Sequence, residues 1–189
     1  VFVEAHSQWK RHPVPDLDVD TLNALGVAVA KFTSNQFGRD NPILSAQLPD
    51  GERIQLVRDP ACERGTMSLT IRKPSMHVRR LQDYTEGGFF ESIRPQTGDM
   101  TPEELELVQL RTAGRYEQFM KRAVELEKVI VVAGETGSGK TTFMRALMQE
   151  VPTSQRVITI EDVHELFMPS HPNRVHLFYP AEGGTNAVV

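Results

Sequence analysis

The stretch GETGSGKT, from Gly134 to Thr141, contains every fixed position of the P-loop signature G-x-x-x-x-G-K-[ST]. The apolar run KVIVVA at 128–133 precedes it and predicts a buried parallel strand, because short runs of β-branched residues are typical of such strands. After the loop, the apolar residues of FMRALM recur at helical spacing, so we expect a helix to begin at Lys140. A strand, a glycine loop and a helix N-terminus in this order make an anion-binding site, since converging backbone N–H groups and the helix dipole both favour negative charge.

The loop therefore predicts a site for ATP with Mg²⁺. Glycine has no Cβ, so it lets the backbone approach phosphate oxygens closely. We expect Lys140 to reach the β- and γ-phosphates and the Thr141 hydroxyl to ligate Mg²⁺. The residues expected to contact the nucleotide are Gly134, Glu135, Thr136, Gly137, Ser138, Gly139, Lys140, Thr141 and Thr142.

Three carboxylates lie at the C-terminal end of the next strand-like run, RVITIED at 156–162, or just after it. We expect this run and the segment 128–133 to be parallel strands joined by the P-loop helix, as in a βαβ unit. Glu161, Asp162 and Glu165 would then lie at the carboxyl edge of the sheet, where ligands collect in parallel α/β folds. There they can act in catalysis by orienting water, binding hydrated Mg²⁺ or serving as a base. The alternative is that they are solvated loop carboxylates.

Three histidines, His164, His171 and His176, lie close to these carboxylates in the sequence. Their spacing matches no usual zinc-binding pattern, and no cysteine is near them. We therefore interpret them as ordinary polar residues, and the one metal ligand that we expect is Thr141.

The pattern of the whole chain predicts an α/β protein with two domains. We expect residues 1–80 to form a small α+β domain, 81–100 to form a linker, and 101–189 to form a truncated RecA-like P-loop domain with a parallel sheet. No second acidic strand of the Walker B kind follows RVITIED, so we expect the chain to be a fragment of a longer protein.

Local signals predict the individual elements of these parts. In the first domain we expect a helix over 19–37, a polar loop over 6–18, and strands over 1–5, 43–48, 53–58 and 66–73. The sequence PDG at 49–51 predicts a tight turn, because glycine adopts positive φ readily. Thr101, Pro102 and Glu104 predict a helix start with a capping box. We expect Gly114 to interrupt the helical pattern that follows.

The composition is that of an ordinary folded protein, with 39% hydrophobic and 24% charged residues among 189. The net charge is −4 and no dense stripe of Lys and Arg is present, so we expect no direct nucleic-acid specificity. A single cysteine, Cys62, excludes a disulfide framework and is compatible with a reducing compartment. No run approaches the roughly 20 apolar residues that a membrane span requires.

Four segments form an ordered series along the chain: LPDGERIQLV, TMSLTIRKPS, GETGSGKTT and ITIEDVHEL. This series, within about residues 43–177, resembles the hexameric traffic ATPases of bacterial type IV secretion systems, relatives of the type II secretion and pilus ATPases. The first two segments are similar to parts of that family's N-terminal domain, the third to its Walker A motif and the fourth to its Asp box. Pilus ATPases usually carry Pro after the Glu-Asp pair, so Val163 and His164 fit the type IV branch better.

The resemblance implies a ring-forming motor, hexameric in that family, that couples ATP binding and hydrolysis to domain motion. Such a motor drives assembly of the secretion machinery or transport of protein substrates, an activity tied to virulence. The resemblance also implies a cytoplasmic protein that is peripheral at the inner face of the cytoplasmic membrane, where it contacts other secretion-system components.

Two arginines of the first domain are candidates for sensing the γ-phosphate. Arg53 and Arg72 lie in the two segments that resemble the family's N-terminal domain, and the resemblance implies a catalytic role for both. Arg145, on the helix after the loop, and Arg156, at the wrong end of its strand, are less suitable. The alternative for Arg53 and Arg72 is ordinary charge on a strand surface.

Three other functions compete with a type IV secretion motor. A pilus or type II secretion ATPase is the nearest alternative. A nucleotide-dependent assembly scaffold without turnover would carry the same Lys140 and Thr141, because binding and hydrolysis share these residues. A small-molecule P-loop kinase is disfavoured by the β-rich domain that precedes the P-loop.

Overall fold

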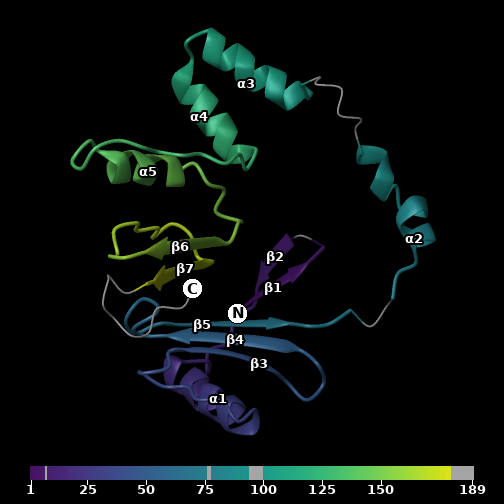
Figure 1. Ribbon diagram of the computed structural model, residues 1–189, viewed down its shortest axis with the longest axis vertical. Helices are drawn as coiled ribbons and strands as arrows, with labels where there is room; N and C mark the ends of the chain where they lie inside the picture. Colours follow the sequence, from purple (N-terminus) through teal and green to yellow (C-terminus); the bar gives the residue numbers. More distant parts are fainter. Residues whose placement is uncertain (7, 76–77, 94–99, 180–189) are drawn as a thin grey trace. The chain divides into compact units, whose positions relative to one another are not determined.

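The computed structural model describes residues 1–6, 8–75, 78–93 and 100–179, which form a mixed α/β protein (Figure 1). The chain divides into two compact units. The first contains Val1–Pro74 and Gly134–Val189, and the second contains Ser75–Ala133. The domain boundaries expected at residues 80 and 100 stay a prediction.

An antiparallel sheet covered by one helix makes up the first part of the first unit (Figure 1). Its strands β3 (Ile43–Gln47), β4 (Arg53–Arg58) and β5 (Met67–Arg72) pair in this order, and α1 (Val19–Phe32) packs on one face. The buried core between helix and sheet consists of Val29, Ala30, Leu44, Ile54 and Leu56. These elements confirm the three strands and the helix predicted for this region.

Helix α1 ends at Phe32, five residues earlier than predicted, because the chain turns at Ser34, whose φ is +56°. The chain then brings Phe37 back against the helix. A Cβ on Gly26 would lie 2.4 Å from the Phe37 ring, so glycine provides the space in which this aromatic ring packs.

A short hairpin at the N-terminus corrects one prediction. β1 (Phe2–Ala5) pairs antiparallel with β2 (Gln8–Arg11), although residues 6–18 were expected to be a polar loop. The polar sequence QWKR does not alternate with apolar residues, so no strand pattern is visible in it. The hairpin is held by its backbone ladder instead, which the bond from the His12 N–H to the Val1 carbonyl extends at 2.8 Å.

A two-stranded parallel sheet follows the P-loop and its helix along the chain. β6 (Val157–Glu161) pairs with β7 (Arg174–Phe178), and the loop 162–173 between them contains no helix. β7 also bonds to the N-terminal sheet region, where the Phe178 N–H donates to the Ala61 carbonyl at 3.0 Å. Strand β7 was not predicted.

The prediction of a strand at KVIVVA is wrong. Residues 128–133 have no strand assignment, and Val129 and Val131 are 94% and 83% exposed. A strand exists only when its N–H and C=O groups pair with a neighbouring strand, and no strand in the described part of the chain pairs with this segment. The helix predicted at Lys140 is confirmed as α5 (Lys140–Met148), but the parallel pair that the structure contains is β6 with β7.

The second unit is helical. It contains α2 (Leu81–Glu86), the 3-10 helix η1 (Phe89–Ser92), α3 (Pro102–Thr112) and α4 (Tyr116–Glu125). α3 and α4 form a helical hairpin, in which Arg122 of α4 donates to Glu106 of α3 at 3.0 Å. The segment expected to be a linker therefore contains two short helices.

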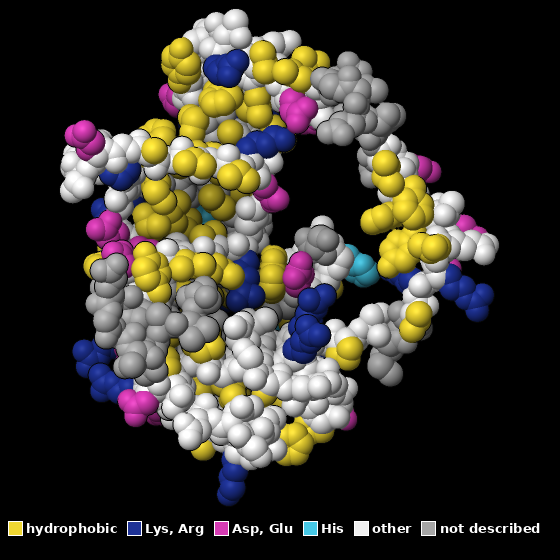
Figure 2. Space-filling model, in the orientation of Figure 1, with side chains coloured by type: hydrophobic (Ala, Val, Ile, Leu, Met, Phe, Trp, Pro, Cys, Tyr) yellow, Lys and Arg dark blue, Asp and Glu magenta, His cyan; other side chains and the backbone are white. Residues whose placement is uncertain are grey.

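Hydrophobic side chains are exposed on α2 and η1 (Figure 2). Leu81 is 78% exposed and Phe89 61%, and the Phe89 ring contacts Tyr84 and Phe90 edge to face. None of the helices in the described ranges combines the length and the apolar sequence that a membrane span requires.

Candidate functional site

The P-loop connects to α5 through two glycines with left-handed backbone. Gly137 has φ +80° and Gly139 has φ +87°, which residues with a Cβ adopt rarely. A Cβ on Gly134 would lie 2.7 Å from Ser138 Oγ, so a side chain there would require the Ser138 side chain to move. The close contact with Ser138 therefore favours glycine at position 134, and the left-handed backbone favours glycine at position 139.

Lys140 contacts the P-loop directly. Its Nζ donates to the carbonyl oxygens of Gly134 at 2.8 Å and Glu135 at 2.7 Å, so the ammonium lies against the loop itself. These are the bonds that a lysine must exchange for phosphate oxygens when an anion enters. The predicted position of Lys140 at the start of the helix is confirmed.

The N-terminus of α5 has no side-chain cap. Gly139 is its N-cap residue, and it makes no side-chain cap hydrogen bond. These N–H groups, the glycine loop and the lysine ammonium together form a set of donors suited to phosphate. Thr141, in the first turn of α5, supplies the hydroxyl expected to ligate Mg²⁺. The residues present thus fit ATP and Mg²⁺.

The three predicted carboxylates have different surroundings, although they lie within five residues. Glu161 is 7% exposed, and its Oε2 accepts the backbone N–H groups of Glu165 and Leu166, each at 2.8 Å. Its Oε1 accepts the Thr159 hydroxyl at 2.7 Å. Burial alone raises the pKa of Glu161, but these hydrogen bonds outweigh burial and hold the pKa below its usual value.

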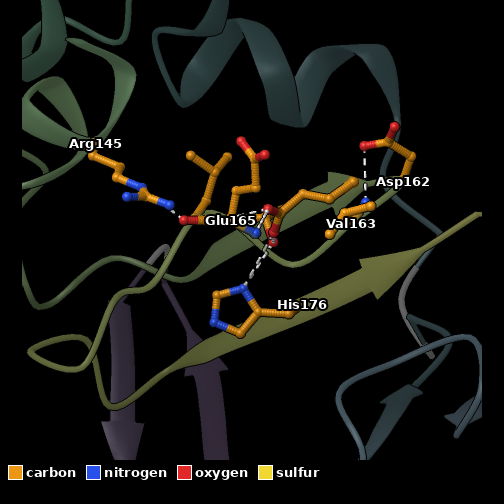
Figure 3. Close-up of polar contacts among 8 residues, drawn as sticks. Arg145, Asp162, Val163, Glu165 and His176 are labelled. Carbon is orange, nitrogen blue, oxygen red and sulfur yellow. Dashed lines mark hydrogen bonds and ion pairs between the residues drawn. The ribbon is translucent and has the colours of Figure 1, made fainter. Parts of the chain in front are cut away.

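Asp162 and Glu165, in contrast, are exposed. The Asp162 carboxylate accepts the Val163 N–H at 2.8 Å (Figure 3). The Glu165 carbonyl accepts from Arg145 Nε at 2.7 Å, which joins the acidic loop to α5 (Figure 3). The structure therefore brings the loop that carries these carboxylates against the helix that begins at the P-loop.

The two candidate sensor arginines are direct cross-strand partners. Arg53 of β4 lies opposite Arg72 of β5, and both are exposed. Their face of the sheet is the one turned away from α1, because the alternate residue Ile54 belongs to the α1 core. On that same face, the Thr70 hydroxyl accepts at 3.2 Å from Arg156, the residue before β6. Sequence reasoning had identified the two arginines but not their pairing.

Two of the three histidines, His164 and His176, lie close to Glu161. His176 Nδ1 lies 2.8 Å from Thr159 Oγ1 and 3.7 Å from Glu161 Oε1, and its ring centroid is 4.5 Å from that of His164. Burial, and then the charge of His164, lower the pKa of His176. One ligand atom each from Glu161, His164 and His176 lie within 4.8 Å of one another.

The sequence analysis did not predict this cluster. His176 and Thr159 are partners in the β6–β7 ladder, so only the parallel pairing of an unpredicted strand reveals their proximity. The third histidine lies apart from the cluster: His171 is buried, with Nε2 at 2.9 Å from the Val151 carbonyl oxygen, so its role is to hold the loop before β7 to the chain after α5.

Comparisons with known proteins give a consistent result. The family model described as "Type II/IV secretion system protein" matches residues 25–185. The type IV secretion system protein VirB11 of Brucella suis biovar 1 (strain 1330) is 59% identical over 182 residues, which are 96% of this chain and 50% of that protein. A PtlH homolog, a type IV secretion system protein of Bordetella bronchiseptica, is 41% identical over 190 residues, which are 100% of this chain and 56% of that protein.

A solved structure is also similar. The crystal structure of the VirB11 ATPase from the Brucella suis type IV secretion system, in complex with sulphate, superposes with a TM-score of 0.90 at 59% identity. The match covers 95% of this chain and 55% of the solved chain. The chain spans about half the length of the curated relatives it matches. With the family model covering residues 25–185, the chain belongs to the type II/IV secretion system protein family.

Proposed function

We propose that this chain contains the nucleotide-binding part of an ATP-hydrolysing motor of a type IV secretion system. The observation on which the proposal rests is the P-loop at an uncapped helix N-terminus, with the Lys140 ammonium on the loop carbonyls. The similarity to a VirB11 ATPase and to a PtlH homolog supports the type IV assignment over the pilus and type II alternatives.

Lys140 is the residue whose contacts change on binding. Its ammonium leaves the carbonyls of Gly134 and Glu135 and binds the β- and γ-phosphates, while the first-turn N–H groups of α5 bind phosphate oxygens. Thr141 would hold Mg²⁺, which neutralises charge that develops on the phosphates. We expect the P-loop domain to be of the RecA-like kind that the sequence predicts.

The three carboxylates have different roles. Glu161, with both oxygens occupied by donors, positions the loop 162–165. Asp162 and Glu165 present exposed carboxylates that can orient water or hydrated Mg²⁺ during hydrolysis.

Arg53 and Arg72 act as sensors of the γ-phosphate. Two cations opposite each other on one sheet face repel, and an anion between them relieves this repulsion. In the part of the chain that the structure describes, neither arginine makes an ion pair with a carboxylate. Their face also contacts Arg156, the residue before β6, which relates the sensors to the P-loop half of the unit.

The motor works as a homo-oligomeric ring, hexameric as in the family that the sequence resembles. It is cytoplasmic and peripheral at the inner face of the cytoplasmic membrane, and there it contacts other secretion-system components. ATP hydrolysis in the ring drives machine assembly or protein transport. The competing proposal is a scaffold that binds nucleotide without turnover.

Two measurements on the full-length protein test this proposal. An assay of phosphate release reports ATP hydrolysis, and native mass spectrometry with and without ATP reports ring formation. Wild-type protein should form a ring and release phosphate. Lys140→Ala should lower release to background with unchanged circular dichroism, because the loop loses the charge that binds the β- and γ-phosphates. Lys31→Ala, at an exposed position on α1, is the matched control and should keep wild-type release.

Retained turnover in Lys140→Ala would overturn the P-loop assignment. Ring formation with ATP but without phosphate release in the wild-type protein would favour the scaffold.

A further inference from the structure

We propose that Glu161, His164 and His176 form a binding site for a divalent transition-metal ion, of which zinc is the best match. One ligand atom from each residue lies within 4.8 Å of the other two. This site is distinct from the Mg²⁺ position at Thr141, and it does not depend on the proposed motor function.

The donor set selects zinc over magnesium. Two imidazoles and one carboxylate are ligands that zinc binds readily, whereas Mg²⁺ and Ca²⁺ prefer oxygen ligands alone. Two ligands of a tetrahedral zinc ion lie about 3.4 Å apart, since each bond is about 2.1 Å long. The cluster must therefore contract by up to about 1.4 Å, since its ligand atoms lie within 4.8 Å of one another.

His164 can supply that contraction. It lies in the loop 162–173 and not in a strand, so its side chain is less constrained than that of His176 in β7. Its Nε2 is buried and has no hydrogen-bond partner among the described residues. A buried ring nitrogen without a partner is unfavourable, and a metal ion would satisfy it.

Glu161 has the capacity for one more contact. A carboxylate has about four lone-pair positions, and three of them accept the Thr159 hydroxyl and the two backbone N–H groups. The two N–H groups share Oε2, so the remaining position is on Oε1, the oxygen 3.7 Å from His176 Nδ1. The three donors hold the carboxylate in place, as the outer contacts of metal ligands commonly do.

The surroundings of the cluster limit the access of water. The side chains of Glu161 and His176 are 6% and 3% exposed. The ring of His164 packs against Phe167 at 4.4 Å and Phe178 at 5.3 Å between centroids. Such an apolar shell controls the access of solvent to a metal site and the local dielectric constant.

The geometry also defines what the ion would do. Glu161 ends β6, His164 lies in the following loop and His176 belongs to β7, so a bound ion would tie the loop to both strands. That loop carries Asp162 and Glu165. A bound ion would therefore restrict the motion of the two exposed carboxylates.

Zinc binding to the full-length protein without nucleotide tests the proposal. Protein stripped with a chelator should take up one Zn²⁺ per chain in calorimetric titration with the metal alone. Co²⁺ in place of zinc should give the intense visible absorption of a four-coordinate ion. His164→Ala and His176→Gln should each weaken Zn²⁺ binding by at least about tenfold.

His12→Asn, an exposed histidine outside the cluster, is the matched control and should bind like wild type. If His176→Gln unfolds by circular dichroism, His164→Ala decides alone, because its loop position leaves the β6–β7 ladder intact. Wild-type protein without stoichiometric zinc would overturn the proposal. So would undiminished binding in folded His164→Ala.

Discussion

At the residue scale, the acidic loop shows how two adjacent carboxylates acquire different chemistry. Glu161 is the last residue of β6, and its side chain turns inward to accept three hydrogen bonds. Asp162 follows in the loop and is exposed. A strand directs successive side chains to opposite faces, so one carboxylate is buried as a structural acceptor and the next remains accessible.

Glutamine substitutions separate these roles. Glu161→Gln should destabilise the fold by about 1–3 kcal/mol, because an amide has one acceptor oxygen and leaves a buried donor unsatisfied. Glu165→Gln should keep wild-type stability but lower kcat more than it raises KM, since an exposed carboxylate that orients water acts mainly in the transition state. Urea unfolding and steady-state phosphate release measure the two effects.

The two variants are controls for each other. Equal stability of Glu161→Gln and wild type would show that the buried network is not needed for the fold. Wild-type kcat in Glu165→Gln would leave that residue as a solvated loop carboxylate. The low pKa of Glu161 also predicts how the contribution of this residue to the stability of the fold depends on pH. The contribution is present above the unfolded-state pKa and is lost as the pH falls through the lower folded-state pKa.

At the element scale, the features predicted correctly are those encoded by neighbouring residues. The Thr101 hydroxyl accepts the Glu104 N–H at 3.2 Å while Glu104 accepts the Thr101 N–H at 2.9 Å, as a capping box requires. Gly114, with φ +69°, separates α3 from α4. Gly51, with φ +91°, makes the turn between β3 and β4. Each signal acts within a few residues, so the sequence alone contains it.

The elements that were missed depend on distant partners. β2 has no apolar alternation and exists through its ladder with β1. β7 pairs with β6 across the 12-residue loop 162–173, and KVIVVA lacks a pairing strand in the described chain despite its apolar sequence. The same distinction applies to the site. The P-loop is local and was predicted, whereas the contact between His176 and Glu161 depends on strand register and was not.

The capping box permits a quantitative test. Thr101→Ala removes the acceptor for the Glu104 N–H and should destabilise the first turn of α3 by about 1 kcal/mol. Amide hydrogen exchange in that turn should accelerate by about fivefold, with little change in β3–β5. Thr101→Ser keeps a hydroxyl and serves as the control. Exchange that is unchanged in Thr101→Ala would mean that Pro102 and tertiary contacts determine the helix start.

At the scale of the whole molecule, the arginine pair offers a reason for a separate N-terminal sheet. The backbone N–H groups of a P-loop cradle the α- and β-phosphates, which ATP and ADP share, so the loop backbone by itself distinguishes the two nucleotides poorly. A second element that binds only the third phosphate gives the two nucleotides different affinities for a closed arrangement. Such a difference is what converts hydrolysis into motion.

Arg72→Ala should therefore lower turnover in the full-length protein by on the order of 10³ or more, while the affinity for ADP changes little, since ADP lacks the γ-phosphate. Arg53→Ala should act in the same direction, because Arg53 is the cross-strand partner of Arg72. Arg64→Ala, exposed in the connection between β4 and β5, is a charge-matched control and should leave turnover unchanged. Equal losses of ATP and ADP binding in Arg72→Ala would indicate contact with the α- or β-phosphate or a damaged sheet. Unchanged hydrolysis would exclude Arg72 from the mechanism, and the two arginines would then be surface charge on β4 and β5.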